Sequence, residues 1–282
     1  MSNPTNAGGG KSPSPPIRRP LKISLAMIAK NEEKRIARSL KSVQYCVGEM
    51  IVVDTGSTDG TKEIARSIGA TVLDYPFQGD FSAARNFSIS ACREDWILVL
   101  DADEFFPISP RFLLEAAVEE PNEGDNPYKG FYILRHNYEN GDQELTYSDY
   151  VLRLFRNRKG VQYRHRVHET PEESLDPIEG RLGTLTAMPI SHYLFDRDQH
   201  YLDSKRLAYV AGLLKDIEEN PTDASRYDFL GCEYVRMGRL ADAERSFQKW
   251  VELAPDHPIA RESLEEVRRL ISGKTWKRKF TA

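Results

Sequence analysis

The chain has 282 residues, of which 40% are hydrophobic and 29% charged, and its formal net charge is -4. This composition excludes a disordered or fibrous chain, and the near-neutral charge argues against a dedicated nucleic-acid binder, whose surface would be strongly basic. The longest apolar run, at 96–100, is far shorter than the roughly 20 residues of a membrane span, and three widely spaced cysteines favour reduced thiols in the cytoplasm.

The first half of the chain alternates short apolar runs with amphipathic stretches. Residues 1–20 are rich in Gly, Pro and Ser and are expected to form a disordered leader. The pattern then predicts strands at 21–29, 50–54, 71–75 and 96–100, and helices at 32–45, 61–68 and 81–92, with Asn31 placed to cap the first helix. This βαβαβαβ order is typical of a parallel sheet with helices on both faces, which binds ligands at the carboxyl ends of its strands.

After residue 107 the pattern changes. A helix is predicted at 110–119, followed by strands at 130–137 and 145–155 that are joined around Asn140-Gly141, a hairpin signal. A further strand is predicted at 161–167. These antiparallel strands would make the sheet mixed.

The region at 203–272 is predicted to be helical, with helices at 204–219, 224–237, 240–253 and 259–270. The second and third match the spacing of a tetratricopeptide (TPR) unit at Tyr227, Leu230, Gly231, Tyr234, Ala243, Phe247 and Pro255. We expect a packing unit that stabilises the first domain, with a concave groove that binds an extended ligand as the alternative. The basic-aromatic tail at 273–282 is expected to be a frayed terminus, and a weak peripheral contact with anionic lipid is the alternative.

Two carboxylates follow the fourth predicted strand. Asp101 and Asp103 occupy alternate positions just beyond its end, so one can bind a hard cation directly while the other acts through water or a sugar hydroxyl. Mg²⁺ and Mn²⁺ prefer such oxygen ligands and leave positions for substrate phosphates. An isolated motif of this kind more often caps a turn, but its place at a ligand-binding sheet edge favours a metal site.

Two other loops carry candidate nucleotide-binding residues. Asp54 ends the second predicted strand, where its carboxylate can accept a uracil imide or a ribose hydroxyl. Residues 57–61 are interpreted as a tight turn with Asp59 as N-cap. Arg85 and Asn86 lie in the first turns of the third helix, which Asp80 or Ser82 can cap, and they present a cation and an amide to a nucleotide diphosphate.

Together, the segments 24–33, 52–61, 80–86 and 101–104 resemble a family 2 glycosyltransferase of the GT-A fold. More narrowly, they are similar to the subgroup that includes lipopolysaccharide-core β-glucosyltransferases and peptide S-glycosyltransferases, some of which carry TPR-like helices. The resemblance implies an α/β GT-A domain at about 21–200, with a Rossmann-like mixed sheet, followed by a small all-α TPR-like region.

The resemblance also implies an activity, which is the inverting transfer of a hexose from a nucleotide-sugar, commonly a UDP-sugar, to a glycan, lipid-linked or peptide acceptor. It places Asn31 and Asp54 along the nucleoside, with Arg85 and Asn86 beside it. Asp101 and Asp103 would hold the ribose and a Mg²⁺ or Mn²⁺. Many members have two aspartates where this chain has Asp54-Thr55, so the identity of the base stays open. The expected location is the cytoplasm, with the inner face of the membrane as an alternative.

Inversion needs a base that deprotonates the acceptor. Glu169 follows the strand predicted at 161–167 and is the first candidate, with His168 or Asp149 as substitutes. His192 ends the next apolar run and would suit a third metal ligand, as in some GT-A enzymes, although a lone histidine is more often structural.

Two rival functions are considered. A nucleotidyltransferase would show a Gly-rich, basic phosphate loop after the first strand, and residues 29–33 do not form one. A non-catalytic TPR-type scaffold would have a degenerate nucleotide site, whereas Asp54, Asp101 and Asp103 are intact.

Overall fold

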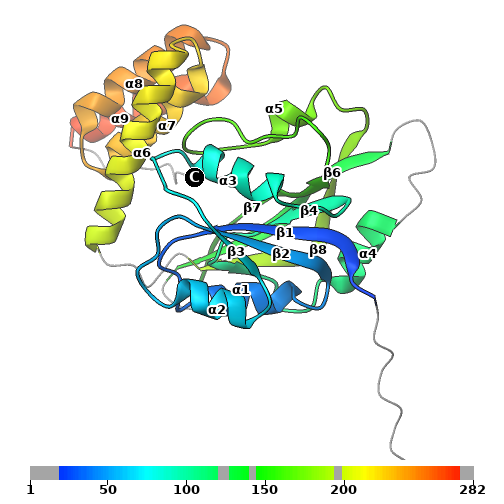
Figure 1. The fold of residues 1–282 in the computed structure, drawn as a ribbon. Helices are drawn as coiled ribbons and strands as arrows, with labels where there is room; N and C mark the ends of the chain where they lie inside the picture. Colours follow the sequence, from blue (N-terminus) through cyan, green and yellow to red (C-terminus); the bar gives the residue numbers. More distant parts are fainter. Residues whose placement is uncertain (1–18, 120–126, 140–143, 194–198, 274–282) are drawn as a thin grey trace, which may run out of the picture.

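The computed structural model describes residues 19–119, 127–139, 144–193 and 199–273 (Figure 1). Three predicted features lie outside the described residues. They are positions 1–18 of the leader expected at 1–20, the hairpin turn at Asn140-Gly141 and the tail from 274. A search of the described helices for one that could span a membrane finds none. Figure 1 shows a sheet flanked by helices, with a separate group of helices at its upper left.

The first half of the sheet is parallel, as predicted. Its elements are β1 (Leu21–Ala29), α1 (Ile36–Val43), β2 (Val47–Asp54), α2 (Thr61–Ser67), β3 (Thr71–Asp74), α3 (Phe81–Ser90) and β4 (Trp96–Val99). β1 pairs in parallel with β2 and with β4, and β2 with β3. α1 and α2 cover one face and α3 lies on the other (Figure 1).

The second half makes the sheet mixed. Its elements are β5 (Glu104–Phe105), α4 (Arg111–Glu119), β6 (Tyr128–Glu139), β7 (Glu144–Arg156), α5 (Glu172–Leu175) and β8 (Arg181–Tyr193). β7 pairs antiparallel with β4 and β6, whereas β8 runs parallel to β6 and antiparallel to β5. The strand order is β3-β2-β1-β4-β7-β6-β8-β5.

The structure differs from the prediction at the strand expected at 161–167 and at the start of the first helix, and it contains one strand that was not predicted. The strand predicted at 161–167 does not form, because His165 and His168 have positive φ angles and only an isolated bridge joins Arg164 to Thr170. The long strand β8 was not predicted. α1 begins at Ile36 instead of Glu32, and Asn31 does not cap it; Asn31 has φ 56° and its Oδ1 accepts a hydrogen bond from the Thr58 amide at 2.8 Å.

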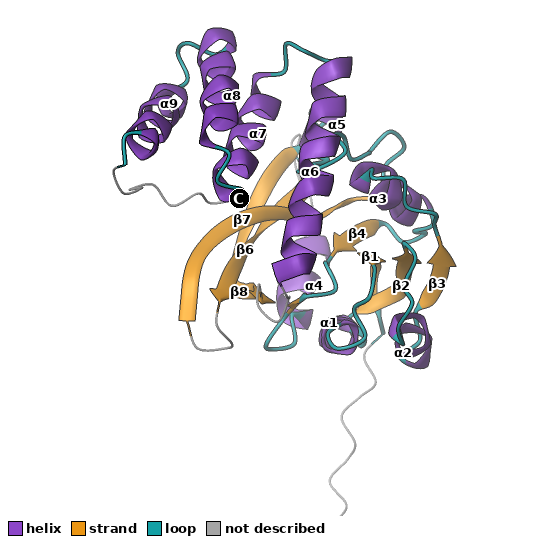
Figure 2. Cartoon of the chain, turned by 90° about the vertical axis from the view of Figure 1, so that its left-hand side faces the viewer, coloured by secondary structure: helices purple, strands orange, loops and turns teal. Residues whose placement is uncertain are grey.

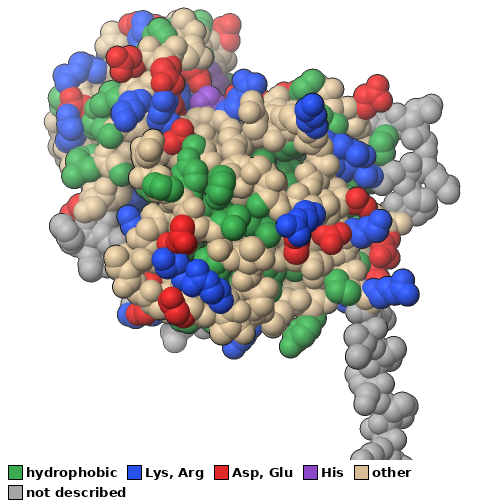
Figure 3. Space-filling model, in the orientation of Figure 1, with side chains coloured by type: hydrophobic (Ala, Val, Ile, Leu, Met, Phe, Trp, Pro, Cys, Tyr) green, Lys and Arg blue, Asp and Glu red, His purple; other side chains and the backbone are tan. Residues whose placement is uncertain are grey.

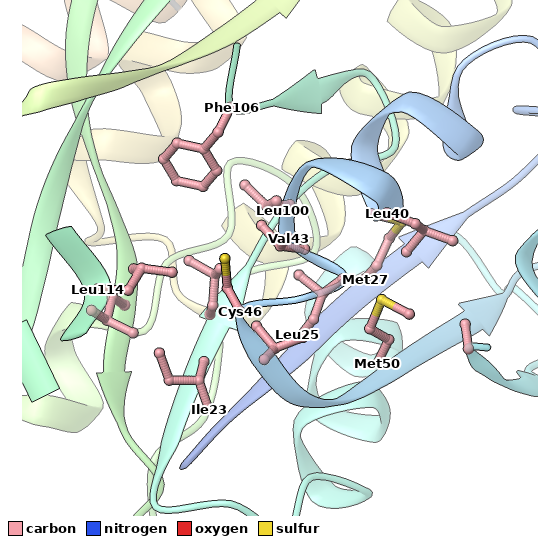
Figure 4. Close-up of a cluster of buried hydrophobic side chains, with 14 of the residues drawn as sticks. Ile23, Leu25, Met27, Leu40, Val43, Cys46, Met50, Leu100, Phe106 and Leu114 are labelled. Carbon is pink, nitrogen blue, oxygen red and sulfur yellow. The ribbon is translucent and has the colours of Figure 1, made fainter. Parts of the chain in front are cut away.

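Each face of the sheet packs against its own apolar cluster. Figure 4 shows the larger one, in which β1 contributes Ile23, Leu25 and Met27, and α1 contributes Leu40 and Val43. The other cluster lies under α3 and includes Ile89 and Phe155. These two cores fix the strand ends that carry the polar side chains described below.

The described C-terminal residues, 199–273, form four helices. They are α6 (Gln199–Glu219), α7 (Ala224–Arg236), α8 (Leu240–Leu253) and α9 (Pro258–Ile271). Gly231 of α7 lies so close to α8 that an added Cβ would be 2.5 Å from the Phe247 ring, which explains the glycine of the TPR-like spacing. α6 runs alongside the sheet domain in Figure 2 and joins it to the other three helices.

Candidate active site

A cleft of about 540 Å³ lies between the carboxyl ends of the central strands and the first two C-terminal helices. Its lining combines strand-end residues, the segment 163–172 and side chains of α6 and α7. On the face shown in Figure 3, a histidine and side chains of the Lys and Arg class lie near the boundary between the group of helices and the sheet domain. Among the predicted site residues, one arginine and three carboxylates line the same cleft: Arg85, Asp101, Asp103 and Glu169. The two histidines proposed with them, His168 and His192, line it as well.

Asp101 is fixed by two arginines. Its Oδ1 accepts a hydrogen bond from Arg85 Nη2 at 2.8 Å, and its Oδ2 accepts one from Arg153 Nη2 at 2.7 Å. Burial alone would raise the pKa of Asp101, but the two guanidinium groups outweigh it and hold that pKa well below its ordinary value. Asp101 is therefore an ionised acceptor in the lining of the cleft, held in place by two arginines.

Asp103 lies beside His192 instead of an arginine. The Oδ1 atom of Asp103 is 3.7 Å from Nε2 of His192, and Nδ1 of His192 is 2.7 Å from Asn137 Oδ1. Burial alone would lower the pKa of His192, but the Asp103 carboxylate outweighs it and raises that pKa. Burial alone would raise the pKa of Asp103, but the adjacent His192 side chain outweighs it and lowers that pKa.

This pair fits a divalent cation. A carboxylate oxygen and an imidazole nitrogen are common ligands of Mn²⁺, and two bonds of roughly 2.1 Å can bridge their 3.7 Å separation. Within the described part of the chain, no group of three His, Cys, Asp or Glu side chains is placed to hold a metal ion. A cation at Asp103 and His192 would therefore need further oxygens from a substrate, as Mg²⁺ and Mn²⁺ often take from phosphates.

A continuous network of polar contacts connects Glu169 with the Asp103 pair. Glu169 contacts Arg85 at 2.6 Å, and Arg85 and Arg153 share Asp101. Arg153 also contacts Glu104, a fully buried carboxylate, at 2.6 Å. From there the contacts continue through Arg135, Asp149 and Asn137 to His192. Because α3, β5, β6, β7 and β8 all contribute side chains and Asp101 directly follows β4, the sheet holds both ends of the network in a fixed relation.

The segment 164–170 joins the cleft to the C-terminal helices. Arg166 forms ion pairs with Asp216 at 2.7 Å and with Glu219 at 2.5 Å, both on α6. Arg226 of α7 donates a hydrogen bond to the Val167 carbonyl at 3.1 Å. Glu169, two residues further on, turns to Arg85 in the cleft. The helices thus hold the segment that carries the first candidate base.

His168 packs as part of this junction. Its ring stacks on Phe229 with centroids 4.1 Å apart and meets Tyr209 edge to face at 5.4 Å. Burial lowers the pKa of His168 to about 3, and the nearby cation of Arg226 acts in the same direction. His168 is therefore neutral at physiological pH, and its Nε2 is buried without a hydrogen-bond partner among the described residues.

The predicted nucleoside-side residues are placed differently. Asp54 accepts hydrogen bonds from the amides of Gly56 and Ser57 with Oδ2, while its Oδ1 is buried without a partner among the described residues. Thr55, the next residue, lines the cleft. Asn86 contacts both the amide and the carbonyl of Tyr163, so its side chain holds the segment 163–172 against α3. Asn31 holds the turn at Thr58.

Several residues of the site were missed by the sequence analysis. Arg135 and Arg153 supply guanidinium groups to the network, Glu104 is the buried carboxylate between them, and Lys205 and Tyr209 of α6 line the cleft. Glu104 adjoins the Asp101–Asp103 motif, and that proximity was an available signal. The others come from strand and helix positions whose meeting depends on the tertiary fold.

Known proteins resemble this chain in sequence and in fold. Residues 24–167, about half of the chain, match the family described as Glycosyl transferase family 2. A TPR repeat-containing protein of Synechococcus elongatus is 35% identical over 248 residues, which are 86% of this chain and 59% of that protein. An uncharacterized glycosyltransferase of Rickettsia typhi is 34% identical over 157 residues, 55% of this chain and 52% of that protein. The chain therefore spans little more than half the length of these curated relatives.

The fold has counterparts among solved structures. The structure of S. aureus TarS 1-349 in complex with UDP-GlcNAc has a TM-score of 0.54 and 12% sequence identity, and the alignment covers 91% of this chain and 93% of that one. At this identity the likeness shows the fold alone. The family match and the shared fold together show that the chain belongs to glycosyl transferase family 2 and has the GT-A architecture that its strand-end motifs resemble.

Proposed function

We propose that this protein transfers a hexose from a UDP-sugar to an acceptor hydroxyl or thiol with inversion, and that a divalent cation assists. The observation that carries the proposal is the network between Glu169 and the Asp103–His192 pair, since it holds a candidate base and a candidate cation site in one cleft. TarS, which was solved with UDP-GlcNAc, shares the fold and supports a nucleotide-sugar donor.

The roles follow from charge. Asp103 and His192 would hold Mg²⁺ or Mn²⁺, which supplies positive charge to the departing diphosphate. Asp101 is held ionised by Arg85 and Arg153 and offers its carboxylate to a donor hydroxyl. Lys205, at the edge of the cleft, adds a second positive charge from the C-terminal helices.

Glu169 would accept the acceptor proton. Its Oε1 accepts the hydrogen bond from Arg85 Nε, so the carboxylate is oriented before the acceptor arrives. Asp149, one of the substitute bases, has both oxygens engaged by Arg135 and Asn137 and does not line the cleft. The ring of His168 stacks on Phe229 and meets Tyr209 edge to face. Glu169 is thus better placed than either substitute.

The test is a donor-cleavage assay with a panel of UDP-hexoses. We expect release of UDP in the presence of Mn²⁺, a loss of that release with EDTA, and recovery when Mn²⁺ is restored. D103N should lose at least about 100-fold of the rate, while D95N, at an exposed carboxylate near the opposite end of β4, should retain it. If the protein binds no UDP-sugar and releases no UDP, the result would support the non-catalytic scaffold instead.

A further inference from the structure

Asn137 occupies an unusual place for an amide side chain. It lies on β6, it is 0% exposed, and the strand register sets it directly beside His192 of β8. Its two polar atoms contact two different site residues: Oδ1 is 2.7 Å from Nδ1 of His192, and Nδ2 is 3.0 Å from Oδ1 of Asp149. No sequence motif pointed to this residue.

The direction of each hydrogen bond follows from its partners. Arg135 donates to both oxygens of Asp149, at 3.0 and 2.6 Å, so Asp149 is an ionised acceptor. The Asn137 atom that faces Asp149 must therefore be the amide NH₂, and the atom that faces His192 must be the carbonyl oxygen. A carbonyl oxygen can only accept, so Nδ1 of His192 carries the hydrogen.

These hydrogen-bond directions leave Nε2 of the neutral His192 imidazole as the nitrogen with a free electron pair. That atom is 3.7 Å from Asp103 Oδ1 and belongs to a residue that lines the cleft. A histidine that binds a metal through Nε2 usually donates its other N–H to an oxygen acceptor, which fixes the ring orientation. Here the acceptor is an amide whose own orientation is set by a carboxylate–arginine pair.

We propose that Asn137 is a positioning residue that fixes His192 in the Nδ1–H form, so that Nε2 and the Asp103 carboxylate together bind a divalent cation. The inference rests on the proposed function for the role of the cation, but the form of His192 can be measured without any metal. Arg135 and Asp149 act through Asn137, and neither of them touches the cation.

The first test uses the intact protein without metal. Long-range ¹H–¹⁵N NMR distinguishes the two neutral forms of a histidine, and the His192 signals are assigned by their loss in H192Q. At a pH above the raised pKa of His192, we expect the Nδ1–H form. Observation of the Nε2–H form would overturn the proposal directly, whatever the variants do.

The second test measures Mn²⁺ binding by electron paramagnetic resonance in the presence of UDP. We expect N137L to mix the two forms of His192 and to weaken Mn²⁺ binding by about 10- to 100-fold, while UDP binding in EDTA stays unchanged. N137S serves as a second variant, because a smaller side chain cannot clash. The matched control is N157L: Asn157 donates to the carbonyls of Cys92 and Glu94, and it is not among the residues that line the active-site cleft.

The outcomes separate the positioning role from the proposed function. Variants that keep the wild-type melting temperature, the Nδ1–H form and the Mn²⁺ affinity would refute the role of Asn137. If the wild type binds UDP but no Mn²⁺, the cation site fails and the proposal falls with it, whereas nucleotide binding still stands. If the variants lose Mn²⁺ affinity and N157L does not, the role of Asn137 is established.

Discussion

The sheet domain and the C-terminal helices differ in what their interiors contain. In the sheet domain, alternating carboxylates and guanidinium groups lie at the strand ends, and Glu104 among them has no exposed surface. In the helices, the core is apolar and contains Phe247 and Trp250, and ion pairs such as Lys249–Glu252 lie on exposed faces. Exposed pairs of this kind contribute little to stability. For the buried network in the sheet domain, the cost of removing the charges from water can exceed their mutual attraction. The network is therefore better explained by preorganisation of the cleft than by stability.

The two regions are joined through the segment 164–170, which contacts buried charged residues of both. Asp216 and Arg226 are buried charged residues of the helices, and both contact the segment 164–170. Glu169 in that segment contacts Arg85 of the sheet domain. A separate partner-binding unit would not require these contacts. We therefore interpret the C-terminal helices as one wall of the cleft.

The largest expected effects come from the two aspartates of the motif, which should differ in their effect on stability. Both D101N and D103N should reduce transfer at least about 100-fold. D101N should also lower the free energy of unfolding by about 2 to 4 kcal/mol, because it weakens the pairing of two buried guanidinium groups. D103N should leave stability close to the wild type. UDP release and chemical denaturation measure the two effects, and equal stability losses would contradict the distinction.

The next effect concerns the base. E169Q should lower turnover by about 100- to 1,000-fold with little change in UDP-sugar affinity, because the amide oxygen can still accept the hydrogen bond from Arg85 but cannot take a proton. E173Q, at an exposed carboxylate close by in the sequence, is the matched control. Single-turnover rates and donor binding by calorimetry separate the two quantities. An unchanged rate in E169Q would move the base to another residue.

The sequence predicted the parts of this architecture that depend on local pattern. The four parallel strands, the helices between them and the C-terminal helices follow from apolar periodicity, and the pair Asp101 and Asp103 follows from its place after a buried strand. β8 was missed because most of its residues are partly or fully exposed, so its apolar pattern is weak. The network of Arg135, Arg153 and Glu104 was missed because its members come from different strands, and their pairing is a property of strand order.

A smaller effect tests whether the helices contribute to donor binding. Lys205 of α6 lines the cleft, and its Nζ is 5.4 Å from the ring centre of Tyr209. If its charge contacts the diphosphate, K205M should weaken UDP binding by about tenfold and leave uridine binding unchanged. K215M, on the same helix but outside the cleft, should bind both like the wild type. Calorimetric titrations of the two ligands make the comparison, and an equal loss for uridine would indicate a structural role.

The smallest effect concerns the pH dependence of the junction between the two regions. His168 has an ordinary pKa of 6.5, and burial lowers its pKa in the folded protein to about 3. Between these values the unfolded chain binds a proton that the folded chain does not, so His168 contributes stability that is fully present above pH 6.5 and declines as the pH falls toward 3. One such proton corresponds to about 1.4 kcal/mol for each pH unit.

The variant H168N isolates this contribution. Asparagine tolerates the positive φ of 51° at this position and does not titrate. We expect the free energy of unfolding of the wild type to fall more steeply than that of H168N between pH 6 and 4, by up to about 1.4 kcal/mol for each pH unit. Urea denaturation at several pH values gives both slopes. Parallel slopes would mean that His168 is protonated in the folded protein and that the helices do not exclude water from this side of the cleft.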